Sequence, residues 1–148
     1  MKKAIPVLEI MSKDPVTLEP GTSVRDAAGA MRERDVGSLI VVEDGKPVGI
    51  VTEKDLVNKV VAEDRRPSDM DLSTVMTAPL VTIGPYQEVL EAARKMAELR
   101  IRRLPVVEGD HLVGLVTEAD VLRVWPALIE ITRERAAMAP AAAEGAMG

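Results

Sequence analysis

Two threonine–aspartate pairs are the residues of this chain whose types and spacing could do chemistry. Thr52 and Asp55 end the run 49–55, and Thr117 and Asp120 end a matching run 65 positions later. A short carboxylate at a helix start can accept hydrogen bonds from two neighbouring hydroxyls, as the acidic residue of dinucleotide-binding folds does for ribose. The same pattern is also a capping box, in which the threonine caps a helix and the aspartate reaches back. The two interpretations are compatible.

Two features of the pairs favour a ligand role beside the capping role. Both copies carry aspartate where a capping box usually has glutamate. Both also place a glycine, Gly49 or Gly114, three residues before the threonine. A glycine at a strand end indicates that another backbone or a ligand approaches closely.

The segments around the pairs are an internal repeat. An ungapped shift of 65 lays residues 11–57 over 76–122, and 19 of these 47 positions are identical. Repetition at this level is a strong architectural signal, and two copies indicate a pseudo-symmetric pair rather than a solenoid. We assign the first repeat to 7–66 and the second to 71–127. Residues 128–148 are expected to extend a helix and then to be a disordered, Ala/Gly-rich tail.

Each repeat has the pattern of a β-α-β-β-α unit, so the fold class is mixed α/β (α+β). Ser23 is a predicted N-cap, and apolar residues at helical spacing follow it and recur in the second copy. The middle strands are unbroken apolar runs, typical of strands covered on both faces. The strands are expected at 15–18, 39–42 and 48–51 in the first copy, and at 80–83, 104–107 and 113–116 in the second.

Composition excludes several classes of function. The net charge of −5 argues against nucleic-acid binding, and no apolar run reaches the ~20 residues that span a membrane. The absence of cysteine fits a cytoplasmic protein, and Lys2 and Lys3 precede no apolar stretch, so we expect no signal peptide. The single histidine, His111, is expected in a solvated turn without a second metal ligand. No nucleophile–base pair is recognisable, so no enzyme and no metal site are predicted.

The duplicated unit with its Gly-x-x-Thr-x-x-Asp ending resembles the tandem cystathionine-β-synthase (CBS) domain pair, or Bateman module. The resemblance covers about 11–61 and 76–126. It implies two clefts between the repeats, related by pseudo-twofold symmetry, that bind adenosine-containing ligands. In such clefts the aspartates, Asp55 and Asp120, would hold ribose hydroxyls. The threonines, Thr52 and Thr117, would contact ribose or phosphate.

The resemblance also implies which segments line the adenine. These are the first-strand segments and the start of the proline-containing strand: Val16, Thr17, Val81, Thr82 and Pro105.

Arg102 and Arg103 precede the proline-containing strand, where a basic pair in this family often meets the ligand phosphate. Arginine suits phosphate because its planar fork makes paired, charge-assisted hydrogen bonds. The alternative is a solvated basic helix end. The first copy has the uncharged residues Gly37 and Ser38 at these positions, so we expect two clefts of unequal affinity.

The resemblance implies a stand-alone regulatory module that senses AMP, ADP or ATP, with or without Mg²⁺, and signals in trans to an unknown protein partner. NAD and S-adenosylmethionine are not distinguished from these nucleotides. It also implies a disc-like homodimer formed through the closing helices, on which Leu56, Val60, Val61, Val121 and Val124 exceed what one unit needs. Trp125, expected to end the second closing helix, would cover the core or anchor an interface. The alternative function is a constitutive dimeric interaction module whose Thr-x-x-Asp motifs only cap helices.

Overall fold

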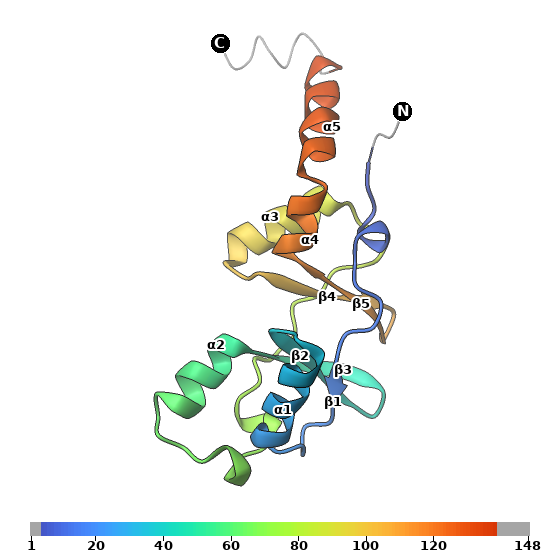
Figure 1. Ribbon diagram of the computed structural model, residues 1–148. Coiled ribbons are helices and arrows are strands. Elements are labelled where there is room, and N and C mark those ends of the chain that lie inside the picture. The colour runs from blue at the N-terminus through green and yellow to red at the C-terminus, as the bar shows by residue number, and fades with distance from the viewer. Residues whose placement is uncertain (1–3, 139–148) are drawn as a thin grey trace.

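The computed structural model describes residues 4–138, which fold into two similar units joined end to end (Figure 1). The β-hairpins of the two units face each other, and the strands β3 and β5 contact one another at the junction. The predicted disordered tail, 139–148, lies outside the described residues. Among residues 4–138, no helix combines the length and apolar character needed to cross a membrane.

The first unit contains a three-stranded sheet, with helix α1 between its first two strands in the sequence and helix α2 after its third. Strand β1 is parallel to β2, and β2 is antiparallel to β3. The closing helix α2 continues into a π-helical turn, η2. The elements are β1 (Thr17–Leu18), α1 (Val24–Arg34), β2 (Ser38–Glu43), β3 (Lys46–Thr52), α2 (Glu53–Leu56) and η2 (Val57–Val61).

The second unit repeats this order with a shorter sheet. Its elements are α3 (Val89–Leu99), β4 (Arg103–Glu108), β5 (His111–Thr117), α4 (Glu118–Arg123) and α5 (Trp125–Ala137). The strand predicted at 80–83 is reduced to one parallel bridge between Ile83 and Val106. Prolines explain why both first strands are short. Pro15 and Pro20 flank β1, and Pro79 and Pro85 flank the bridge. A proline has no amide hydrogen to donate to the hydrogen-bond ladder of a sheet.

The predicted helix starts and strand burial agree with the structure. The Asp26 amide donates to Ser23 Oγ at 3.0 Å, so Ser23 caps α1. Val24, Ala27 and Met31 are buried, as are the matching residues of α3. The middle strands are also buried over 38–41 and 104–106.

The segment that precedes each repeat packs on the other unit. Ile5 and Val7 belong to the core of the second unit, and the segment 70–75 supplies Met70, Leu72 and Val75 to the core of the first. Backbone bridges join Ser12 to Leu115 and Thr77 to Ile50. The two units are therefore interlocked, and a lead-in segment passes beside each Thr-x-x-Asp motif. Three short 3₁₀ turns lie in these segments: η1 (Val7–Glu9), η3 (Pro67–Asp69) and η4 (Leu72–Thr74).

The closing helices differ from the prediction in two respects. Trp125 does not end α4. The chain leaves helical geometry at Val124 and Trp125 starts α5, because Pro126 lacks an amide hydrogen and fits only the first turn of a helix. Val60 and Val121 are buried inside their own units, so they add nothing to an exposed surface. The exposed apolar side chains of η2 and α4 are Val57, Val61 and Leu122, and Trp125 is exposed at the start of α5.

Candidate functional site

Both Thr-x-x-Asp motifs are complete capping boxes. At the second motif the Asp120 amide donates to Thr117 Oγ1 (3.3 Å) and the Thr117 amide donates to Asp120 Oδ2 (2.8 Å). The first motif has the same pair of bonds between Thr52 and Asp55. Both aspartates are buried, at 9% exposure for Asp55 and 7% for Asp120. The capping role is thus real in both copies, and it leaves part of each carboxylate for other partners.

The glycines of the two motifs are explained by the protein itself. A Cβ at Gly49 would lie 2.7 Å from Met76 Sδ, and one at Gly114 would lie 2.6 Å from Met11 Sδ. Met11 and Met76 are matching residues, the first of the aligned ranges 11–57 and 76–122. Each methionine lies on the lead-in segment that crosses to the other unit. The close approach predicted at these glycines is therefore made by the lead-in segments, through a methionine at both and also through the Ser12 carbonyl oxygen at Gly114, so the glycines are no sign of a ligand.

A pocket of about 590 Å³ adjoins the second motif. Four segments line it, at 12–16, 35–38, 102–103 and 115–123, so both repeats contribute. The volume lies within the 300–1,000 Å³ range of small-molecule sites. Five of the predicted site residues line this one pocket: Val16, Arg102, Arg103, Thr117 and Asp120.

Three guanidinium groups line the pocket. Arg102 Nε lies 3.7 Å from Glu118 Oε2, and both side chains are largely exposed, so the pair is weak and easily exchanged. Arg103 Nη2 would lie 2.7 Å from a Cβ at Gly37, which means that the missing side chain of Gly37 leaves room for Arg103. The third is Arg123, whose Nη2 pairs with Asp120 Oδ1 while 71% of the Arg123 side chain stays exposed.

Sequence reasoning did not find Arg123. A signal was present, because Arg123 follows Asp120 by three residues, and positions three apart on a helix are neighbours. Acidic groups also line the pocket at Asp14, Asp35 and Glu118. The site therefore presents three positive groups among four carboxylates, counting Asp120. Such a lining can bind a ligand that carries both hydroxyl donors and an anionic group.

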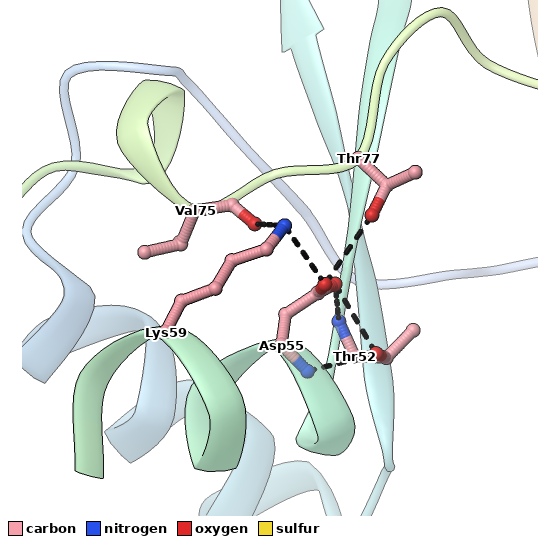
Figure 2. A network of polar contacts seen from close by, with 5 residues as sticks. All are labelled: Thr52, Asp55, Lys59, Val75 and Thr77. Carbon is pink, nitrogen blue, oxygen red and sulfur yellow. Dashed lines mark hydrogen bonds and ion pairs between the residues drawn. The ribbon is translucent and has the colours of Figure 1, made fainter. Parts of the chain in front are cut away.

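The first motif is surrounded differently, as Figure 2 shows. The Asp55 carboxylate accepts hydrogen bonds from the Thr52 amide (2.9 Å), Thr52 Oγ1 (3.1 Å) and Thr77 Oγ1 (3.3 Å). Lys59 Nζ lies 3.1 Å from Asp55 Oδ1 and donates to the carbonyl oxygen of Val75 at 2.8 Å. Neither Lys59 nor Thr77 was predicted, although Lys59 follows Asp55 by four residues along the helix.

The remaining predicted residues lie away from the 590 Å³ pocket. Thr17 is an exposed residue of β1, and Val81 is 38% exposed. Pro105 is buried within β4, and the carbonyl oxygen of Thr82 accepts a hydrogen bond from Lys95 Nζ at 2.7 Å. The assignment of these four residues to an adenine site stays a prediction.

A second pocket, of about 520 Å³, lies on the helical face of the second unit. It is lined by α3, by residues 100–102 and by the segment 118–125, which includes Leu122 and Trp125. Leu122 is 63% exposed and Trp125 is 47% exposed. In the part of the chain that the structure describes, no three residues among His, Cys, Asp and Glu are grouped so that they could hold a metal ion.

The duplicated unit, the interlocked lead-in segments and the paired motifs define a tandem CBS domain pair. The family model described as the CBS domain matches residues 7–62 and 71–127, and the chain belongs to this family. Among relatives, MJ0653 of Methanocaldococcus jannaschii is 41% identical over 136 residues, which are 92% of this chain and 70% of that protein. MK0525 of Methanopyrus kandleri is 37% identical over 134 residues, 89% of this chain and 68% of the relative.

Solved structures confirm the predicted fold. The CBS domain pair of protein MJ0100, in complex with 5′-methylthioadenosine and S-adenosyl-L-methionine, has a TM-score of 0.76 and 29% sequence identity. The match covers 84% of this chain and 98% of that one. The hexameric CBS-CP12 protein from bloom-forming cyanobacteria has a TM-score of 0.76 and 37% identity, over 81% of this chain and 71% of its own.

Proposed function

We propose that this chain is a non-enzymatic sensor that binds an adenosine-containing ligand in the 590 Å³ pocket and signals the binding to a protein partner. The observation that carries the proposal is the convergence of one buried motif carboxylate, Asp120, with three arginines on a single pocket. Asp120 would accept bonds from the ribose hydroxyls. Arg102, Arg103 and Arg123 would meet the phosphates of AMP, ADP or ATP.

The comparison with MJ0100 supports the ligand class, because that CBS domain pair binds two molecules that contain adenosine. The arginines favour an anionic member of the class over a neutral or cationic one. If ATP or ADP is the ligand, its polyphosphate can bring Mg²⁺ with it.

Ligand binding changes the relation between the two repeats only if the two states of the protein differ in affinity for the ligand. The pocket satisfies a necessary condition for such coupling. Its lining joins the lead-in segment 12–16, the first unit at 35–38 and the second unit at 102–103 and 115–123. A ligand there would bridge all four segments and fix their relative positions.

A homodimer is the second part of the proposal. Apolar surface is exposed on the closing helices by Val57, Val61 and Leu122 and at the start of α5 by Trp125, and the 520 Å³ pocket lies beside the last two residues. Exposed apolar surface that includes a tryptophan is typical of protein interfaces. We expect light scattering at tens of micromolar to give about twice the chain mass of 16.0 kDa. A monomer at that concentration would contradict this part of the proposal.

A thermal-shift panel of AMP, ADP, ATP, NAD and S-adenosylmethionine tests the sensor function. A ligand that binds only the folded protein raises its Tm in proportion to the logarithm of ligand concentration. We expect at least one nucleotide to raise Tm for the wild-type protein, and much less for Asp120→Asn. Asparagine can still accept from the Thr117 amide, so this variant keeps the cap while it removes the charge.

The competing candidate is a constitutive interaction module, and the observation that favours it is the complete capping box at both motifs. Under that function no member of the panel raises Tm. Asp120→Ala then costs only cap stability, about 0.5–2 kcal/mol.

A further inference from the structure

The two motif aspartates differ in how many hydrogen-bond acceptor positions they have left. An ionised carboxylate has about four lone-pair positions. Asp55 uses four, for the Thr52 amide, Thr52 Oγ1, Thr77 Oγ1 and Lys59 Nζ. Its carboxylate is therefore saturated by groups of the protein itself (Figure 2).

Asp120 has the same cap, but the acceptor positions of its carboxylate are not all used. Within residues 4–138 its carboxylate accepts from the Thr117 amide and from Arg123, so about two of its four positions stay open. A ribose diol brings two hydroxyl donors, which match these two open positions. The saturation of the first motif therefore distinguishes two otherwise matching capping boxes.

The difference arises from two sequence positions. At a shift of 65, Lys59 corresponds to Val124, which carries no charge, and Thr77 corresponds to Ser12. Ser12 is exposed and lines the 590 Å³ pocket without a hydrogen bond to Asp120 among the described residues. Asp120 therefore has no counterpart of the two extra contacts that Asp55 makes with Lys59 and Thr77.

Lys59 is also held more firmly than an ordinary surface lysine. Its Nζ bridges two acceptors, Asp55 Oδ1 at 3.1 Å and the Val75 carbonyl at 2.8 Å, and 41% of its side chain is exposed. Lys59 sits in the π-helical turn η2, a local geometry that often marks functional positions. The Val75 carbonyl belongs to the lead-in segment that carries Thr77, so both extra donors tie this segment to the closing helix of the first unit.

From these contacts we propose that Lys59 and Thr77 occupy the place of the ribose hydroxyls at the first motif, so that the chain binds one nucleotide and only at the second motif. The inference rests on the proposed function and specifies its stoichiometry. The first Thr-x-x-Asp motif is then a fixed internal junction, and the second is the sensing site.

Isothermal titration calorimetry with AMP, ADP and ATP, each used separately on the full chain, tests the stoichiometry. The wild type is expected to bind one nucleotide per chain. Asp55→Asn is expected to leave the affinity within about twofold, and Asp120→Asn to lower it at least about tenfold. The titrations of the wild type, Asp55→Asn and Asp120→Asn do not require any variant at Lys59.

The double variant Lys59→Met/Thr77→Val tests the cause. It frees two acceptor positions on Asp55, so the first motif is expected to gain at least about tenfold in affinity and the stoichiometry to rise to two per chain. Adding Asp120→Asn to the double variant should return the stoichiometry to one. Lys54→Met is the matched control, since it removes an exposed lysine of α2 that, among the described residues, makes no ion pair with the Asp55 carboxylate, and it should leave one site. Circular dichroism checks that each variant is folded.

The outcomes separate this inference from the proposed function. A wild type that binds two nucleotides, one of them lost in Asp55→Asn, overturns the inference and leaves the proposed function standing. A folded double variant that still binds only one overturns the role of Lys59 and Thr77. If the wild type binds none of the three nucleotides, the proposed function fails and the inference fails with it. If the double variant does not fold, the titrations of the wild type, Asp55→Asn and Asp120→Asn still decide whether the first motif binds a nucleotide.

Discussion

Arg123 allows a prediction in which one substitution affects two related ligands in opposite directions. Its guanidinium pairs with Asp120 and lines the proposed phosphate side of the pocket. The Arg123→Met variant removes both interactions while it keeps an unbranched apolar stem. Adenosine has no phosphate, so its affinity should respond only to the release of Asp120. The affinity for AMP should respond to the lost phosphate contact as well.

The magnitudes follow from exposure and charge. Because 71% of the Arg123 side chain is exposed, its bond to Asp120 is worth about 0–1 kcal/mol. Releasing Asp120 should therefore strengthen adenosine binding by up to about fivefold. A charge-assisted hydrogen bond to phosphate is worth about 1.5–3 kcal/mol, so AMP binding should weaken by about 2- to 150-fold net of that gain.

Isothermal titration calorimetry of adenosine and AMP with the wild type and Arg123→Met is the assay. Arg25→Met, an exposed arginine of α1 outside the pocket, is the matched control and should change neither affinity. Equal weakening of both ligands would refute the proposed competition at Asp120. An unchanged affinity for AMP would refute the phosphate contact.

Three further predictions concern the surface and the packing. Leu122→Glu places a charge on the exposed closing-helix surface and should convert the dimer to a monomer in light scattering, without loss of helix in circular dichroism. The hydrogen bond to Glu108 and the charge of Glu108 raise the pKa of Tyr86, the single tyrosine, above its ordinary value of 10.0. The stabilisation that this hydrogen bond gives is present below pH 10.0 and is lost as the pH rises through the raised pKa. In a titration followed by tyrosinate absorbance, Glu108→Gln should therefore bring the midpoint back toward 10.0, and an unchanged midpoint would contradict this cause. Gly114→Ala would place a Cβ 2.7 Å from a backbone carbonyl oxygen and should cost about 1–3 kcal/mol, seen as a lower Tm. Gly49→Ala meets only a flexible methionine side chain and should lower Tm less.

The repeat and its local structure were predictable from the sequence. Ser23, the helix faces of α1 and α3 and the buried middle strands follow from spacing and residue type within short segments, and the structure agrees with them. The capping boxes are local for the same reason, because Thr52 and Asp55 are only three residues apart. The end of the second closing helix was predicted slightly too late, at Trp125, whereas the chain leaves helical geometry at Val124.

The contacts between distant segments were not predictable. The bond from Thr77 to Asp55 spans 22 residues, and the bond from Lys59 to the Val75 carbonyl spans 16. The methionines that fill the space beside Gly49 and Gly114 also come from the lead-in segment on the opposite unit. These contacts depend on which unit each lead-in segment packs against, and no spacing along the chain carries that information.

By itself, the sequence determined that the chain holds two copies of one unit, each ending in a threonine–aspartate helix cap. Only the tertiary structure decided that the two aspartates have different surroundings. The capping bonds are made within one turn of helix, so matching sequences form matching caps. The remaining acceptor positions of each carboxylate depend on the hydrogen-bond donors that the lead-in segment and the next helical turn place beside it. These are Lys59 and Thr77 at Asp55, and an exposed arginine beside an open pocket at Asp120.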